Sequence, residues 1–206
     1  MNRAATLYFP LFLTFWVTAA AAGQKNKFDT IKSELASARE VKLKVAVAVT
    51  SKIFKDVDSS NGEIAIADDG RYFAQMGRDI YLFDGKCTWE ISLEYRQATK
   101  RCLKDGEKFE NRLVFIKNLD EYYEPHPIRK DLIYLLTRKD SDDSPMPDSL
   151  TIFLDKSADR IARLEYFDLN GDLNRVYILS ERPNPAITDS LYHFNRPDSM
   201  EVITLP

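Results

Sequence analysis

The sequence predicts a mainly β protein of the α+β class, built from antiparallel strands. Three observations predict this class. Hydrophobic and polar residues alternate at a period of two through much of the chain, short apolar runs are separated by turn signals such as Asp-Gly, and the chain holds 10 Tyr and 12 Phe but only 7 Gly. Regular short strands joined by tight turns are typical of an antiparallel meander and not of a parallel α/β sheet.

The first 22 residues have the layout of a secretory signal peptide. Arg3 gives a positive start, an apolar run continues from residue 4 to residue 22, and Ala20 and Ala22 fit the small-x-small pattern that precedes a cleavage site. The alternative is an uncleaved membrane anchor, because the run is nearly long enough to span a bilayer. Pro10, which interrupts the run, and its Ala-only end favour cleavage. We therefore expect residues 1–22 to be removed on export.

The composition of the chain limits what the exported part can be. Residues 23–206 suit a single domain, and a chain of this size buries ~70% of its unfolded surface. The formal net charge of −3 excludes a nucleic-acid-binding protein, which requires a basic surface. No later stretch is apolar enough to span a membrane, so we expect a soluble monomer.

The first structural element after the signal segment is a predicted helix at residues 26–38. Its apolar residues fall at helical spacing and form one stripe: Phe28, Ile31, Leu35 and Ala38. From Val41 the period changes to two, which predicts a long half-buried strand over residues 41–53. Residues 58–62 have the composition of a turn.

Two further blocks of strands follow, divided by a segment with a different pattern. The first block is predicted at residues 63–67, 71–75, 79–83, 87–92 and 96–103. Residues 109–119 fit a short helix. We expect Pro125 and Pro127 to end the element that precedes them. The second block is predicted at residues 132–137, 150–154, 160–167 and 175–180, with an aromatic pair at Tyr192 and Phe194 in a last strand.

Three stretches together resemble the periplasmic outer-membrane lipoprotein carriers of the LolA type. Residues 83–89 (FDGKCTW) are similar to the family's SDGKxLW strand entry, and Gln97, Ala98 and Thr99 follow at the family's spacing. Residues 62–73 are similar to its GxLxxxRPxxF segment. The last run, from residue 192 to residue 203, is similar to its FxFxxPxGVxV ending. Order and spacing match over nearly all of residues 23–206.

The resemblance implies both a fold and a function. The fold would be a strongly curved, unclosed antiparallel β-barrel with helices lidding its concave face. The function would be to shield the acyl chains of lipoproteins, or of a related lipid, in an apolar cleft and to transfer them across the periplasm from an inner-membrane transporter to an outer-membrane acceptor. No catalysis or cofactor is required. One departure is that the family's Arg-Pro falls at Asp68 and Asp69, with Arg71 as a neighbouring replacement.

The same resemblance implies which residues bind the lipid. We expect an apolar cleft between the concave sheet face and the lid, with six residues in contact with the cargo: Tyr72, Trp89, Ile91, Leu113, Phe115 and Ile116. Trp89 corresponds to the family's cavity-side tryptophan, and Leu113, Phe115 and Ile116 match its apolar lid helix. The alternative for these side chains is ordinary core packing.

The chain offers little for metal binding or catalysis. His126 and His193 have no partner at ligand spacing. Asp168, Asn170 and Asp172 resemble part of a calcium loop, but the distal Glu is missing, so a hairpin turn is favoured. We find no Gly-x-Ser-x-Gly nucleophile motif. We therefore expect that the protein has no metal site and no enzymatic activity.

The two cysteines predict a disulfide. If residues 96–103 pair antiparallel with residues 87–92 through a turn centred on Glu94 and Tyr95, then Cys87 lies opposite Cys102. Export supplies the oxidising compartment. The alternative is two separate thiols, which follows if the turn is offset by one residue and the two side chains point to opposite faces.

Two other functions fit the same open barrel. One is a signalling module that senses lipidated ligands. The other is a carrier for a glycolipid or another specialised lipid, which the departure at Asp68 and Asp69 would permit.

Overall fold

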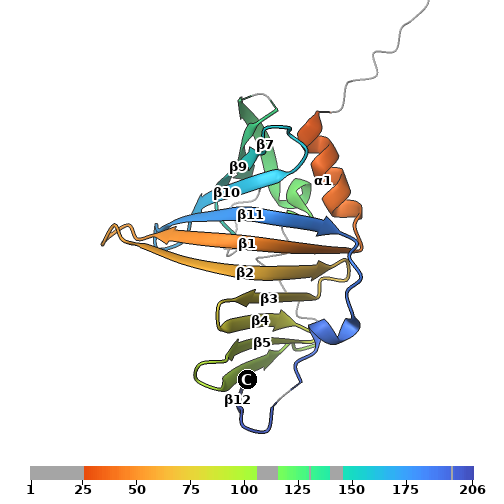
Figure 1. The fold of residues 1–206 in the computed structure, drawn as a ribbon, viewed down its shortest axis with the longest axis vertical. Helices are drawn as coiled ribbons and strands as arrows, with labels where there is room; N and C mark the ends of the chain where they lie inside the picture. The colour runs from red at the N-terminus through yellow and green to blue at the C-terminus, as the bar shows by residue number, and fades with distance from the viewer. Residues whose placement is uncertain (1–25, 106–115, 130, 140–145, 196) are drawn as a thin grey trace, which may run out of the picture.

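The computed structural model describes residues 26–105, 116–129, 131–139, 146–195 and 197–206, and all its strands join in one sheet (Figure 1). The strands are β1 (Glu40–Thr50), β2 (Val57–Ala67), β3 (Tyr72–Met76), β4 (Asp79–Phe83), β5 (Cys87–Ser92), β6 (Gln97–Cys102), β7 (Tyr123–Arg129), β8 (Ile133–Arg138), β9 (Ser149–Leu154), β10 (Ile161–Phe167), β11 (Leu173–Pro183) and β12 (Glu201–Leu205). The helical elements are α1 (Lys27–Ser37), the short α2 (Leu119–Tyr122) and the 3-10 turn η2 (Asp189–Tyr192). The predicted β-rich class is therefore confirmed.

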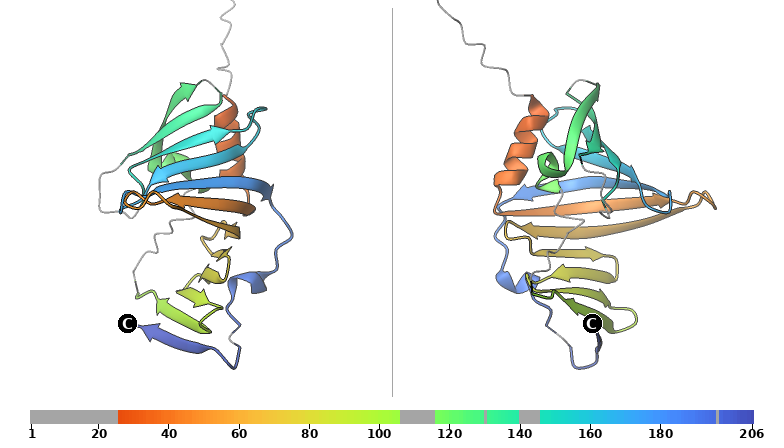
Figure 2. Two further views of the ribbon diagram at one scale, coloured as in Figure 1. Left: turned by 60° about the vertical axis from the view of Figure 1, so that its left-hand side comes forward. Right: turned by 180° about the vertical axis from the view of Figure 1, so that it is seen from behind.

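The sheet is curved and does not close. Its order is β12-β6-β5-β4-β3-β2-β1-β11-β10-β9-β8-β7, so β12 and β7 are its two edges. Neighbouring strands are antiparallel except β12, which runs parallel to β6. Figure 2 shows the strands turning progressively from one edge of the sheet to the other. This is the unclosed antiparallel barrel that the sequence predicts.

Helix α1 covers part of the concave face. Asn26 caps it, because its side-chain oxygen accepts a hydrogen bond from the Asp29 N–H at 2.7 Å. The apolar stripe of α1 is buried in the main core, where the Phe28 ring stacks on Tyr134 of β8 with centroids 4.4 Å apart. Lys32, which is nearly buried, bridges Asp29 and Asp120 and so joins α1 to α2.

The opposite face of β2–β6 is covered by the chain between β11 and β12. We call residues 184–195 the strap. Tyr192 of the strap is fully buried against Ala65 and Ala67 of β2, and Phe194 packs with Trp89 in a further small core. One half of the sheet is therefore packed on both faces, although only the concave face belongs to the main core.

Three predicted boundaries were wrong. The turn lies at residues 51–56 and not at 58–62, because β2 pairs with β1 from Val57 onward and Ser51 organises the turn. Pro125 lies inside β7, which is possible because β7 is an edge strand. Tyr192 belongs to η2 and not to a strand, because the strap crosses the sheet without pairing to it before β12.

Candidate functional site

An apolar cavity of about 730 Å³ lies on the concave face of the sheet. It extends from β10 and β11 across β1, β2 and β3 to β5, β6 and β12. Alternate residues of β1, β2, β3, β6, β10 and β11 point into it, as the period of two requires. Its apolar lining is Leu43, Val45, Val47, Ile64, Ile66, Ala74, Met76, Ile116, Leu164, Val176, Ile178 and Leu205. The cavity therefore offers an extended hydrocarbon surface.

Polar side chains gather at one end of this cavity. Thr88 and Glu90 of β5 and Thr99 and Arg101 of β6 contribute to its lining there. Thr88 lies opposite Arg101 and Glu90 lies opposite Thr99 in the antiparallel register, so all four share one face. The cavity is amphipathic, with an apolar body and a polar end.

Tyr72, Tyr81 and Tyr166 line the cavity, and the pKa values of the first two are raised. Burial raises the pKa of Tyr72 to about 12, and the nearby Glu90 carboxylate adds to the shift. The pKa of Tyr81 is also raised, first by burial and then by Asp79 and Glu90. Both phenols stay neutral at physiological pH, so they can contact an apolar chain along the ring without adding a buried charge.

The structure brings only part of the predicted lipid-binding set together. Tyr72 and Ile116 line the cavity. Ile91 does not line it, which corrects the prediction: it is buried on the opposite face with Ala98 and Met200. Leu113 and Phe115 lie outside the described residues.

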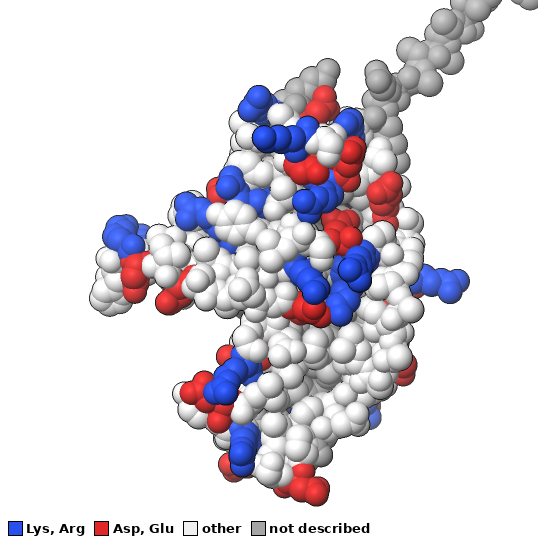
Figure 3. Space-filling view, in the orientation of Figure 1, with Lys and Arg blue, Asp and Glu red and all other residues white. Residues whose placement is uncertain are grey.

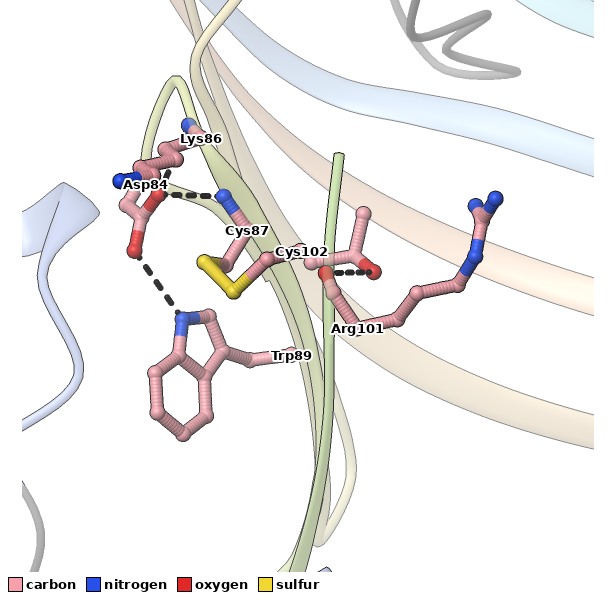
Figure 4. Close-up of a disulfide and its surroundings, with 7 residues drawn as sticks. Asp84, Lys86, Cys87, Trp89, Arg101 and Cys102 are labelled. Atoms are coloured by element: carbon pink, nitrogen blue, oxygen red, sulfur yellow. Dashed lines mark hydrogen bonds between the residues drawn. A yellow bond between two sulfur atoms is a disulfide. The ribbon is translucent and has the colours of Figure 1, made fainter. Parts of the chain in front are cut away.

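Trp89 contributes to the cavity lining, but its indole ring lies on the opposite face. The ring packs against Phe194 of the strap with centroids 5.0 Å apart, and Lys100 lies over it at 4.8 Å. Its N–H donates to the Asp84 carboxylate at 3.1 Å. Figure 4 shows the Trp89 ring on the side of the sheet opposite Arg101. This tryptophan anchors the strap.

Cys87 and Cys102 are joined by a disulfide. They are directly opposed in the β5–β6 ladder, in the register that the sequence predicts. The disulfide lies on the same side of the hairpin as the Trp89 ring (Figure 4). Asp84 accepts hydrogen bonds from the Cys87 and Lys86 N–H groups, which closes the turn before β5.

Arg71 holds the strap and does not line the cavity. Its guanidinium is bonded to Asp69 and to Asp189 of η2, and it lies over the Tyr192 ring at 4.9 Å. The hydrogen bond with Asp189 is the largest cause that raises the pKa of Arg71. A different cation, Lys117, is buried on the concave side and donates to the Ala38 carbonyl at 2.7 Å.

The cavity residues that the sequence prediction missed are mostly aliphatic. Val45, Val47, Ile64, Met76 and Val176 line the cavity. The alternation itself could have identified them, because Leu43, Val45 and Val47 lie on one face of β1. Helix α1, through Ile31 and Leu35, covers only part of that face. The family motifs do not include most of these aliphatic positions.

Among the described residues, no cluster of His, Cys, Asp and Glu could hold a metal ion. Asp168 accepts from the N–H groups of Asn170 and Asp172 and from the Asn174 amide, which makes residues 168–172 a hairpin turn. In the same part of the chain no helix has the length and apolarity needed to cross a bilayer.

No protein-family model matches the sequence, and no curated protein matches it. Solved structures do match in fold. An uncharacterized conserved protein from Thermus thermophilus is 9% identical, with 87% of this chain and 97% of that chain covered and a TM-score of 0.50. A LolA superfamily protein from Nitrosomonas europaea is 11% identical, with coverages of 80% and 96% and a TM-score of 0.42. A chain of the MucA/MucB complex of Pseudomonas aeruginosa is 12% identical, with 87% of this chain and 62% of that chain covered and a TM-score of 0.38.

At these identities the likeness concerns the fold. The predicted curved, unclosed antiparallel sheet with a helix on its concave face is confirmed by the architecture.

Proposed function

We propose that this protein is a periplasmic carrier that shields the acyl chains of lipoproteins, or of a related lipid, in the concave cavity. The observation that carries the proposal is the cavity itself, about 730 Å³ and lined mainly by aliphatic side chains. Cavities of ~300–1,000 Å³ are the usual size of small-molecule sites. The carrier would act as a monomer between an inner-membrane transporter and an outer-membrane acceptor.

The physical basis of the proposal is burial of hydrocarbon. Each CH₂ group moved from water into the cavity contributes ~0.8 kcal/mol, so a chain of ten such groups gains ~8 kcal/mol before the costs of ordering. The polar end at Thr88, Thr99 and Arg101 would leave the head of an amphiphile near water. Shielding and release need no bond to be made or broken, so we propose a binding protein and not an enzyme.

The proposal is tested with neighbouring substitutions on opposite faces of β1. Val47 lines the cavity, whereas Ala48 points to the other face, opposite Arg175 of β11. Val47→Glu places a charge in the apolar cavity and should abolish binding of a fluorescent acyl probe, because a buried unpaired charge is costly. Ala48→Glu adds the same charge on the outer face and should bind the probe as the wild-type protein does.

Lipid extracted from the purified wild-type protein and identified by mass spectrometry gives the chemical class of the cargo. Acylated peptides support a lipoprotein carrier, and glycolipids support the specialised-lipid alternative. If the two Glu variants, both shown to be folded by circular dichroism, bind the probe equally well, the cavity is not the binding site and the proposal is wrong.

A further inference from the structure

The turn between β1 and β2 projects from the body of the protein (Figures 1 and 3). Ile53 is 79% exposed and Phe54 is 78% exposed. Turns are usually built from Gly, Pro, Asn, Asp and Ser, and two adjacent large hydrophobic residues at a turn are unusual. An exposed apolar group of this kind marks an interaction site.

A second turn brings another apolar residue to the same end of the molecule. Leu169, in the turn between β10 and β11, is 84% exposed. The Lys52 N–H donates to the Asp172 carboxylate at 2.8 Å, and the Lys52 side chain lies across Gly171. The two turns are therefore in contact. We call Ile53, Phe54 and Leu169 the apolar tip.

The projecting turn is ordered by its own hydrogen bonds. The Ser51 hydroxyl accepts from the N–H groups of Ile53 at 3.3 Å and Phe54 at 3.2 Å. The Ser51 backbone bonds to Asp56 and Lys55, at 3.0 Å and 3.1 Å. This network holds the two apolar side chains outward before any partner binds, so little conformational entropy is lost when the tip is buried.

Two lysines flank the apolar residues of the projecting turn. Lys52 and Lys55 flank Ile53 and Phe54, and their long side chains can reach headgroup phosphates while the apolar residues lie deeper. Acidic residues are also close, but the Asp168 and Asp172 carboxylates already accept backbone N–H groups within the two turns. Asp56 ends the turn next to Lys55, and Asp58 is the second residue of β2.

One end of the cavity lies toward the apolar tip. Val47 of β1 and Val176 of β11 lie opposite each other and line the cavity just before their strands reach the two turns. Tyr166 of β10 lines it next to the same end. A surface bound at the tip would therefore lie beside one end of the cavity.

From these observations we infer that the apolar tip docks the protein on a phospholipid bilayer, with Ile53, Phe54 and Leu169 inserted at the level of the headgroups. Insertion removes three exposed apolar side chains from water, which is the driving force for peripheral membrane binding. The inference stands on the tip alone and does not require the cavity to hold a lipid.

Co-sedimentation of the mature protein with vesicles of phosphatidylethanolamine and phosphatidylglycerol tests the inference. The tip variant is Ile53→Ser combined with Phe54→Ser. The matched control is Ile128→Ser combined with Leu179→Ser, which removes two apolar residues that are 62% and 58% exposed outside the tip. We expect vesicle binding to fall at least tenfold in the tip variant and to be unchanged in the control.

A second measurement locates the contact directly. Phe54→Trp should show fluorescence that shifts to the blue on vesicle addition and is quenched by brominated lipid chains. Binding of a monomeric acyl probe in the absence of vesicles should be the same in the tip variant and the wild type, which separates docking from cargo binding.

Three results would overturn the inference. The first is a wild-type protein that does not sediment with the vesicles. The second is equal loss of binding in the tip variant and the matched control. The third is a tip variant that changes only the oligomeric state in size-exclusion chromatography, since this would make the apolar tip a contact between protein chains.

Discussion

Glu181 is half-buried on the concave side of β11. It lies opposite Leu43 of β1, and its Oε2 atom has no hydrogen-bond partner among the described residues. Burial raises the pKa of Glu181, and Glu34 of α1 adds to the shift while Arg160 opposes it. The charged form is therefore unfavourable in the folded protein at neutral pH.

Glu181→Gln should raise the stability at neutral pH. Because the folded-state pKa of Glu181 is higher than its unfolded value, the folded protein binds more protons between the two values, and its stability falls as the pH rises through that window. The neutral amide removes this loss. We expect a gain of about 1 kcal/mol in the free energy of unfolding at pH 8.

The same substitution should make little difference at pH 4, where the carboxyl group of the wild type is largely protonated. Urea unfolding at both pH values measures the two differences. A variant that is no more stable than the wild type at pH 8 would show that the Glu181 carboxylate has a partner that compensates for its burial.

The inward position of Glu181 could not be predicted from the alternation of β11. Val176 and Ile178 point to the cavity, so a regular strand would direct residue 181 outward. The register shifts between Lys44 and Val45, where β11 contributes an extra residue. Such a bulge reverses the two faces, and it depends on the partner strand and not on the local sequence.

At the scale of elements, the β5–β6 hairpin shows what the sequence can and cannot predict. Its register was predicted correctly, because turn composition and the positions of Cys87 and Cys102 limit the possible pairings. The face that meets the cavity was predicted wrongly for Ile91. Alternation separates two faces but does not say which one a distant segment will cover, and here the strap covers the face that carries Trp89 and Ile91.

Removal of the disulfide should destabilise the protein. Cys87 and Cys102 are 15 residues apart, and closing a loop of this length contributes about 3 kcal/mol in the chain-entropy model. We expect the double variant Cys87→Ala, Cys102→Ala to lose up to this amount in urea unfolding. The wild type should lose a similar amount when reductant is added, and the double variant should not respond to reductant.

Peptide mapping gives an independent check on the pairing. Both cysteines should resist alkylation in protein purified without reductant, until reductant is added. Alkylation of both without reduction would contradict the disulfide.

At the scale of the whole molecule, the class and the general architecture were predictable, whereas the composition of the cavity was only partly so. Alternation and turn signals are local, and they define most of the strands. The β1–β2 turn was misplaced because Ser51 organises it through hydrogen bonds that composition does not reveal. Tyr72 and Ile116, which the sequence analysis assigned to lipid binding, line the cavity, whereas most of the aliphatic lining residues were overlooked because no motif includes them.

Cleavage of the predicted signal segment is a property of the whole chain. The small-x-small pattern ends at Ala22, so we predict that the mature protein begins at or near Gly23. Intact-mass measurement of protein from the periplasmic fraction checks the cleavage site. A mature species that retains Met1 would favour the membrane-anchor alternative instead.

The strand order has a consequence for how the chain folds. Strands β1 to β6 pair with their neighbours in sequence and can form as hairpins, as can β7 to β11. The pairing of β1 with β11, in which Val41 meets Pro183, joins positions far apart in the chain and carries a much larger loop-closure entropy. Until β11 is synthesised, the other edge of the apolar strand β1 has no partner, and an uncovered edge of this kind promotes aggregation. Addition of β11 to β1 should therefore limit the folding rate, and the newly made chain is most vulnerable in the interval before that step.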